Sequence, residues 1–172
     1  MTKVMAAEQS ESGYAKATRV LRESAGDPDR AVAALVLSRF PEHDEAWHAL
    51  LVVAVEDHQW LGAGVAEEAL QVMSQRHPRH VDWTPVSPIV RNVLDGTALG
   101  ALWTVIDVLR RTGVDERQAA ALLGGGGEML TPLLESSRKD LSGAAHALLV
   151  QLHGQDLGSS PEVWRRWIAT LN

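Results

Sequence analysis

The chain has 172 residues, 45% of them hydrophobic, and its formal net charge is -6 at pH 7. A chain of this length and composition can bury a core, and its negative charge disfavours nucleic acid or an anionic membrane surface as the main ligand. It lacks cysteine, which excludes disulfides and cysteine-ligated zinc. The first residues contain no apolar stretch of secretory length, and the longest apolar run is too short to span a membrane. We therefore expect a cytoplasmic protein.

Apolar residues recur at helical spacing along the first half, whereas no alternation of period two persists. Three stripes mark amphipathic helices: Tyr14, Ala17 and Leu21; Trp47, Leu50, Leu51 and Ala54; and Ala66, Ala69, Leu70 and Met73. The stretch from Ala31 to Leu37 is apolar nearly all round, which predicts a helix covered on both sides. We expect residues 1–9 to be disordered or frayed and residues 10–80 to form helical repeats.

The segment from Pro41 to Pro78 resembles a tetratricopeptide repeat. Trp47 opens its first helix, and the small Ala66 marks the helix crossing in its second. The preceding segment, DPDRAVAALVLSRFP, looks like the second helix of an earlier repeat, with Asp29 at the small-residue position. Pro41 to Pro78 spans 37 residues against about 34 for this repeat, so we expect an insertion in VEDHQW.

The prolines Pro78, Pro85 and Pro88 interrupt the helical pattern. Since proline disfavours a continuing helix, this cluster predicts a boundary between residues 10–80 and residues 81–172. We nevertheless expect the two halves to form one continuous structural unit.

The stretch from Ala98 to Leu109 is again apolar nearly all round, which predicts an inner helix of a stack. Trp103 lies off its main stripe, Arg110 and Arg111 follow it, and Arg91 lies on the preceding helix. Aromatic and arginine side chains are favoured at interface hot spots. We predict that these four residues form part of a groove for an acidic or amphipathic helical segment of a partner protein. Alternatively, Trp103 packs against an adjacent helix and the arginines are solvated.

Residues 114–135 resemble a helix-turn-helix motif, the alternative to a protein-binding function. Ala120, Gly124, Leu130 and Leu133 have the spacing that lets two helices cross tightly. The helix that would read bases, however, carries acidic side chains and offers no Arg, Lys, Asn or Gln to base edges. We therefore expect no nucleic acid as the main partner.

The segment GEMLTPLLESSRKDLSGAAHALLVQLHG resembles a HEAT-type repeat, with one helix, a charged turn and an Ala/Leu-rich helix. In the second helix, the apolar stripe consists of Leu141, Ala145, Leu148, Leu149 and Leu152. Asp140 is suited to cap the start of this helix, and Gly154 to end it in a left-handed conformation.

The following stretch, GQDLGSSPEVWRRW, resembles the Gly-x-Asp…Pro-x-x-Trp-x-x-Trp endpiece of bacterial HEAT-like proteins. Ser160 is a natural N-cap and Pro161 a natural first helical residue. Trp164 and Trp167 fall on one face of the predicted helix, and Arg165 points away. Because a terminal repeat otherwise leaves its apolar face in water, we predict that this helix caps the array.

We predict no catalytic, cofactor or metal site. Gly124 to Gly127 lacks the Lys and Ser/Thr that a P-loop requires, and we interpret it as an elbow between helices. His43 and His48 are five residues apart and face different ways, and Pro78 keeps His77 and His80 from sharing a regular turn. We interpret His77 as a core residue at a helix end. No Gly-x-Ser-x-Gly nucleophile elbow occurs.

Together these patterns predict an all-α protein, an α-solenoid of about nine or ten helices stacked as antiparallel pairs. The two resemblances imply tetratricopeptide-like repeats in residues 10–80 and HEAT-like repeats in residues 81–172. Stacks of this kind offer grooves for peptides and helices. We predict a non-enzymatic adaptor, scaffold or immunity-type protein whose partner is another protein or peptide.

Overall fold

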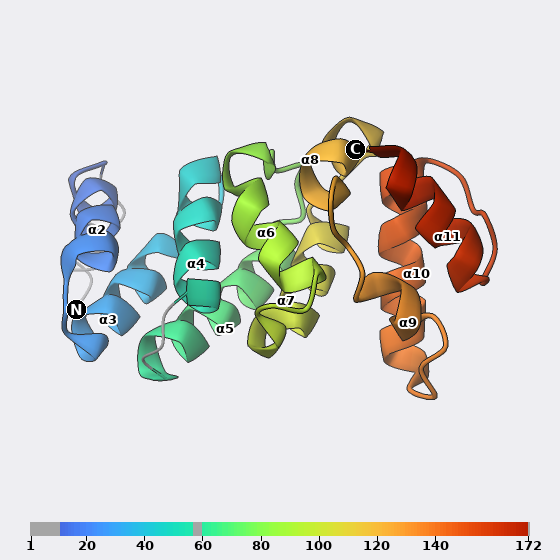
Figure 1. The fold of residues 1–172 in the computed structure, drawn as a ribbon. Helices are drawn as coiled ribbons and strands as arrows, with labels where there is room; N and C mark the ends of the chain where they lie inside the picture. The colour runs from blue at the N-terminus through green and yellow to red at the C-terminus, as the bar shows by residue number, and fades with distance from the viewer. Residues whose placement is uncertain (1–10, 57–59, 172) are drawn as a thin grey trace. The chain divides into compact units, whose positions relative to one another are not determined.

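The structure, a computed structural model, describes residues 11–56 and 60–171. Within these ranges it contains ten α-helices, three short 3-10 segments and no strand (Figure 1), so the prediction of an all-α fold with about nine or ten helices is confirmed. Residues 1–9, for which we expected disorder, lie outside the described residues. The chain divides into two compact units between His77 and Pro78.

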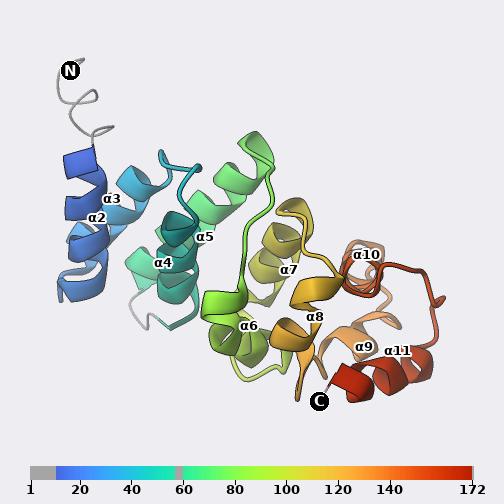
Figure 2. The same ribbon diagram turned by 90° about the horizontal axis from the view of Figure 1, so that it is seen from above.

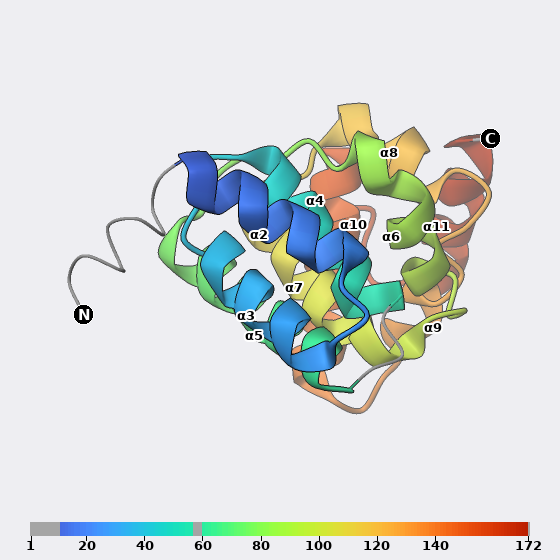
Figure 3. The same ribbon diagram turned by 90° about the vertical axis from the view of Figure 1, so that its left-hand side faces the viewer.

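The first unit consists of two helical hairpins. Its helices are α2 (Glu11–Glu23), α3 (Asp27–Leu37), α4 (Asp44–Glu56) and α5 (Trp60–Arg76). Helix α2 packs on α3 and α4 packs on α5, while α3 also packs on α5 and α2 on α4. The two hairpins therefore stack in register, with α2 and α4 in one layer and α3 and α5 in the other. Figure 3 shows the first hairpin, α2 and α3, nearest to the viewer.

The two hairpins begin at a constant offset along the chain. Helix α4 begins 33 residues after α2, and α5 begins 33 residues after α3. At this offset the buried core residues correspond in pairs: Ala33 with Ala66, Leu37 with Leu70, and Phe40 with Met73. The prediction of an insertion in VEDHQW, of which residues 57–59 lie outside the described ones, was based on a 37-residue spacing that the helices do not have. The small-residue position of the first hairpin is Ala33 rather than Asp29.

The second layer of this unit has an open face, which corrects one expectation. Of the apolar stretch from Ala31 to Leu37, Val32 is 61% exposed and Leu35 is 53% exposed. Helix α3 packs against the other helices through Ala31, Ala34 and Leu37, and no described helix of the unit covers its opposite side. The prediction that this helix is covered on both sides was wrong.

The second unit contains six α-helices and the three 3-10 segments. In chain order these are η1 (Thr84–Val86), α6 (Ser87–Leu94), η2 (Leu99–Ala101), α7 (Leu102–Arg111), α8 (Glu116–Leu123), α9 (Leu130–Leu133), α10 (Lys139–His153), α11 (Pro161–Ile168) and η3 (Ala169–Leu171). Helix α10 packs on α7, α8 and α9, and α6 packs on α7 and α8 (Figure 2). The buried stripe of α10 matches the prediction at Ala145, Leu148, Leu149 and Leu152, whereas Leu141 is half-buried.

A buried tryptophan attaches the start of this unit to its helices. Trp83 is fully buried, and its indole N–H donates to the Thr112 hydroxyl at 2.9 Å. The backbone N–H of Trp83 donates to the side-chain carbonyl of Gln118 at 2.9 Å, and the Gln118 amide donates back to the carbonyl of Val81. These bonds satisfy polar groups that burial would otherwise leave unpaired.

The glycine run lies between α8 and α9, as the elbow interpretation predicted. Gly125 and Gly127 have φ values of 77° and 81°, which L side chains rarely adopt. The guanidinium of Arg91 donates to the carbonyl of Gly124 at 3.1 Å, and the N–H of Gly127 donates to the carboxylate of Asp95. Two side chains from α6 and its end therefore hold the elbow in place.

The C-terminal endpiece forms a short helix against α10. Gly154 ends α10 with a φ of 78°, as predicted, and Pro161 is the first residue of α11. Ser160 occupies the N-cap position, but its hydroxyl donates to the Glu162 carboxylate instead of capping the backbone. Asp140 does not cap α10, because the helix already begins at Lys139 and the Asp140 carboxylate pairs with Arg138.

Two further findings complete the description of the helices. His77 follows the last residue of α5 and is exposed, so the expectation of a core histidine was wrong. Among the described residues, no single helix is long and apolar enough to cross a bilayer. The segments Thr84–Leu94 and Leu99–Arg111 reach that length and composition only together, across a bend of 100°.

Candidate protein-binding surface

Three of the four predicted binding residues share one helix. Trp103, Arg110 and Arg111 lie on α7, which forms because its buried residues Thr104, Val105, Ile106, Val108 and Leu109 provide a wide apolar face toward the unit. Leu99 and Trp103 are 54% and 39% exposed, so the stretch from Ala98 to Leu109 is not the fully covered inner helix that we expected. It is also not one helix, since η2 precedes α7.

The exposed side of α7 is organised around one carboxylate. Asp107 lies one turn after Trp103 and one turn before Arg110 and Arg111, so all four side chains are neighbours along the helix. The Asp107 carboxylate is 2.7 Å from Nε of Arg111 and 4.0 Å from the nearest guanidinium nitrogen of Arg110. Its side chain is only 14% exposed. One largely buried carboxylate is therefore the ion-pair partner of two arginines.

This sharing leaves the exposed side of α7 itself with one more positive than negative charge, while Asp156 in the opposite wall of the adjoining cleft adds a negative one. Arg111 makes the short contact with Asp107, while Arg110 is at the outer limit of an ion pair and 35% exposed. The backbone carbonyl of Arg110 accepts a hydrogen bond at 3.2 Å from Gln151 of α10, which fixes the end of α7 against that helix. Arg110 is thus the cation of this face that is best placed to meet an external anion.

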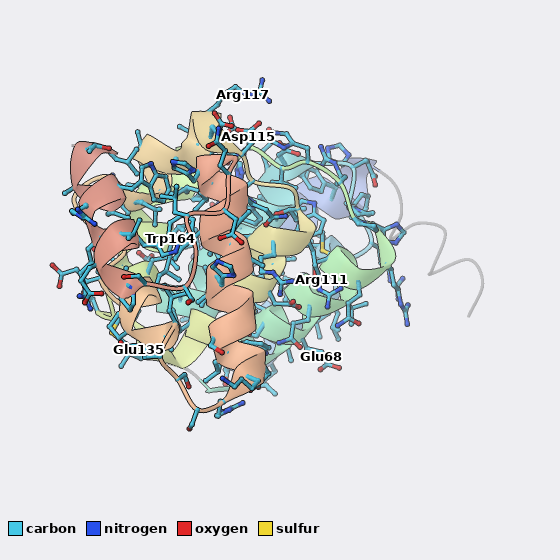
Figure 4. The ribbon with its side chains drawn as sticks, turned by 90° about the vertical axis from the view of Figure 1, so that its right-hand side faces the viewer. Glu68, Arg111, Asp115, Arg117, Glu135 and Trp164 are labelled. Atoms are coloured by element: carbon cyan, nitrogen blue, oxygen red, sulfur yellow. The ribbon has the colours of Figure 1, made fainter. Side chains whose placement is uncertain are left out.

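A cleft of about 510 Å³ adjoins the two arginines. Its polar walls are formed by Asp107, Arg110 and Arg111 of α7, His146 and Gln151 of α10, and Asp156 of the loop that follows. The His146 ring lies 2.9 Å from the Asp156 carboxylate. Figure 4 shows Arg111 beside α10, on the side of that helix away from Trp164.

The Asp156 carboxylate is held in its charged form. Its oxygen accepts a hydrogen bond from the backbone N–H of Gly158 at 2.7 Å and lies beside the His146 ring. Both contacts favour the anion, the Gly158 bond most, and they hold the pKa of Asp156 below its usual range. The loop that closes the cleft is therefore held to α10 by a charged group.

Arg91 does not share this arrangement. It lies on α6, and its guanidinium is bonded to the carbonyl of Gly124 in the glycine elbow. The sequence spacing alone could not distinguish a ligand-facing arginine from one that supports a loop 33 residues further along the chain. Its position in the structure is that of a supporting residue.

Sequence reasoning did not identify Asp107, His146, Gln151 or Asp156 as part of this surface. The pairing of Asp107 with Arg111 follows from their spacing of four residues and was recognisable in the sequence. Asp156 and His146 are brought together only because the chain reverses after Gly154. No local pattern indicates that contact.

A second cleft of about 540 Å³ lies where the glycine elbow meets the C-terminal helix. Its walls include Gly125 to Gly127, Thr131 and Arg165, and Nε of Arg165 donates to the Thr131 hydroxyl at 3.2 Å. Arg165 is exposed, as expected, and its guanidinium also pairs with the Glu162 carboxylate, while its Nε reaches back to the Thr131 hydroxyl. Because Arg165 and Thr131 are bonded to each other, this cleft has fewer polar groups available to bind a ligand than the first cleft.

No metal-like cluster of three or more His, Cys, Asp or Glu side chains occurs among the described residues. The carboxyl groups with a lowered pKa are surface groups: Asp115 beside Arg117, Asp140 beside Arg138, Asp156 and Glu162. Figure 4 shows Asp115 and Arg117 at the surface, projecting away from the helices. These are solvated contacts rather than groups prepared for proton transfer.

The chain matches no protein-family model, no curated protein and no solved structure. The geometry of its surfaces is therefore the basis for a functional assignment.

Proposed function

We propose that the chain is a helical-repeat protein that binds another protein, as an adaptor, scaffold or immunity-type partner. Its binding surface is the exposed side of α7 with the adjoining cleft, and its ligand is an acidic or amphipathic helical segment. The observation that carries the proposal is the exposed Trp103 on the same helix side as Arg110, whose positive charge Asp107 only partly neutralises.

Two features of the chain support a repeat architecture. In the first unit, the offset of 33 residues between hairpins is close to the period of about 34 of tetratricopeptide repeats. In the second unit, four residues of the endpiece motif have a structural role: Gly154 ends α10, Asp156 contacts His146, Pro161 begins α11 and Trp164 is buried. We assign tetratricopeptide-like repeats to residues 10–80 and a HEAT-like array to residues 81–172 on this basis.

Physical chemistry makes this surface suitable for binding. Trp103 is 39% exposed, so a partner that covers its indole buries hydrophobic area. The residue lies on a helix, which fixes its backbone before binding. Arginine forms paired hydrogen bonds with carboxylates, which adds specificity for an acidic segment. This combination is typical of the few residues that contribute most of the affinity in an interface.

The DNA-binding alternative is not favoured by the helix that would enter the groove. Helix α9 spans only Leu130–Leu133, about one turn, and contains Pro132. Thr131 is buried, and its hydroxyl accepts from Arg165. A helix this short presents too few side chains to read several base pairs.

The proposal is tested by affinity capture from the native cell with the wild-type chain and two variants. The first variant combines Trp103→Ala and Arg110→Ala, and the second is the control Arg117→Ala. Arg117 is the control for Arg110, since it is an exposed arginine of the same unit that pairs with Asp115 and does not line the cleft. We expect a captured protein that the control retains and that the double variant loses by about tenfold or more, equivalent to about 1.4 kcal/mol.

Thermal melts must show that the double variant folds, which is expected because both side chains are at the surface. A protein captured equally by all three chains would place the binding surface elsewhere. A sequence motif enriched from a random DNA pool at physiological salt, and lost when Arg138 and Lys139 are replaced, would favour the DNA-binding alternative instead.

A further inference from the structure

The first unit has an apolar surface of its own, separate from the surface on α7. Val32, Leu35 and Leu61 are 61%, 53% and 39% exposed, and they are three of the five exposed large apolar side chains among the described residues. Val32 and Leu35 are one turn apart on α3, and Leu61 lies in the first turn of α5. Scattered exposed apolar residues are normal, but neighbours on adjacent helices form a patch.

The register between α3 and α5 places these side chains on one surface. The carboxylate of Asp27, in the first turn of α3, accepts hydrogen bonds from the backbone N–H groups of Leu61 and Gly62, in the first turn of α5. The two helices therefore run parallel with their starts side by side. Both form one layer whose other side packs on α2 and α4, so their exposed faces point the same way.

The 33-residue offset shows how this surface is built. Val32 corresponds to the half-buried Val65, and Leu35 corresponds to Glu68. The first hairpin thus contributes an aliphatic side chain where the second contributes an exposed carboxylate, which lies at the surface in Figure 4. Gly64 is exposed between Leu61 and Glu68, and no atom lies within 4 Å of where its Cβ would be. The surface is therefore an apolar strip with open space above Gly64 and an acidic end.

Charge indicates what this strip binds. Residues 1–77 contain seven Lys or Arg and twelve Asp or Glu. Residues 78–172 contain nine Lys or Arg and ten Asp or Glu. Most of the negative charge of the chain therefore belongs to the first unit. On the two helices, Asp29 and Glu68 are exposed, and the exposed Arg39 follows the last residue of α3 by two positions. A positively charged partner is attracted to this unit, and a negatively charged one is repelled.

We propose that the exposed face of α3 and α5 binds an amphipathic helix with basic residues beside its apolar stripe, supplied by a second partner protein. An apolar stripe with residues at i, i+3, i+4 and i+7 covers Val32, Leu35 and Leu61, and flanking Lys or Arg side chains meet Glu68 and Asp29. This inference goes beyond the surface on α7 and does not depend on it.

A second copy of the chain is a less suitable occupant. A stable dimer buries about 800 Å² on each partner. Three exposed apolar side chains on two helices provide much less than that area, and two copies of this acidic unit repel each other. A single helix needs only a narrow strip, which matches the size of this one.

The experiment uses a displayed library of helical peptides and the full chain. Peptides of about 18 residues carry a fixed leucine stripe at helical spacing. All the remaining positions are randomised among Lys, Glu, Gln and Ala. We expect selection on the wild-type chain to enrich Lys over Glu at the positions flanking the stripe. The best peptide is then synthesised and titrated by fluorescence anisotropy against the wild type and against matched variants.

The variant with Val32→Ser and Leu35→Ser should bind this peptide about tenfold more weakly, because two apolar contacts are lost. Glu68→Lys should weaken binding, and more so at low salt than at high salt, since the contact is electrostatic. Trp103→Ala, on the other unit, should leave the affinity unchanged. All of these side chains are exposed, so a melt is expected to show folded protein in each case.

Three results would overturn the proposal. One is a selected pool in which Glu equals or exceeds Lys beside the stripe. Another is an equal affinity of the peptide for the wild type and for the Val32→Ser, Leu35→Ser variant. The third is a wild-type dimer in light scattering that the same double variant converts to a monomer, which would assign this surface to self-association. None of these results bears on the α7 surface, which the capture experiment with Trp103 and Arg110 tests separately.

Discussion

The indole N–H of Trp164 donates a hydrogen bond to the backbone carbonyl of Gly158 at 2.6 Å. The bond closes the loop between α10 and α11, since Gly158 precedes the helix that carries Trp164. The tryptophan ring is fully buried between these helices (Figure 4), and it makes edge contacts with the rings of His146 and His153. Gly158 has a φ of 86°, so glycine is favoured at the position that the bond requires.

Trp164→Ala should destabilise the fold by about 3–5 kcal/mol, because it removes a fully buried aromatic side chain and leaves a cavity. Trp164→Phe should cost less, since it retains most of the apolar area and loses the indole bond to Gly158. Urea unfolding followed by circular dichroism measures both changes. Trp103→Ala is the matched control, and equal small effects at both tryptophans would show that α11 does not cap the second unit.

Arg165→Ala should cost about 1 kcal/mol rather than nothing, because its guanidinium donates to the buried Thr131 hydroxyl. From the sequence alone we expected only that this side chain points away from the aromatic face of the helix. Arg166→Ala is the control, since Arg166 is exposed and its Nε is 3.4 Å from its nearest acceptor, the carbonyl of Glu162. If the unfolding curves of both variants coincide with that of the wild type, the bond from Arg165 to Thr131 does not stabilise the fold.

The contact between Asp156 and His146 should make stability depend on pH in the acid range. The pKa of Asp156 is lowered in the folded state, chiefly by the N–H of Gly158 and then by His146. The stabilisation is therefore fully present above the unfolded pKa of about 3.9, and it is lost as the pH falls through the folded value. Asp156→Asn should be less stable than the wild type at pH 6, and the difference should shrink as the pH falls below about 4.

Urea unfolding at several pH values between about 2.5 and 7 measures this difference, and Asp140→Asn, which should show a pH dependence of its own, gives the size of the effect at a surface carboxylate elsewhere. Asp140 is an exposed aspartate with a lowered pKa, but it pairs with Arg138, away from the endpiece. If the difference in unfolding free energy between the wild type and Asp156→Asn stays constant with pH, the Asp156 charge does not stabilise the loop.

Asp27→Ala should destabilise the first unit by about 1–2 kcal/mol, because the carboxylate accepts from two backbone N–H groups at the start of α5. Asp29→Ala is the control, since Asp29 is exposed and its carboxylate accepts a long hydrogen bond of 3.5 Å from the hydroxyl of Ser24. Hydrogen exchange should also show faster exchange of the Leu61 and Gly62 amides in Asp27→Ala. Unchanged exchange at these amides would contradict a cap supplied by the neighbouring hairpin.

The features that could be predicted from the sequence were local ones. The apolar stripes of α4, α5 and α10 and the left-handed end at Gly154 follow from helical periodicity and from glycine stereochemistry, which depend on residues within a few turns. The burial of Trp164 could be predicted because a short helix with an aromatic face has to cover an apolar surface. For Trp103, off the stripe of its helix, the sequence left both an exposed and a packed position open, and the structure leaves it 39% exposed.

What only the tertiary structure decided was which helices are neighbours. The sequence predicted that α3 is covered on both sides, but hydropathy does not tell how many helices surround a given one, and Val32 and Leu35 remain exposed. The 33-residue offset became clear only when the helix starts were known, because the prolines Pro41 and Pro78, which set the expected spacing, do not lie at equivalent positions of the two hairpins. Arg91, Arg165 and Asp27 bond to backbone or hydroxyl groups more than thirty residues away. Such bonds depend on where the chain returns in space, which no local pattern specifies.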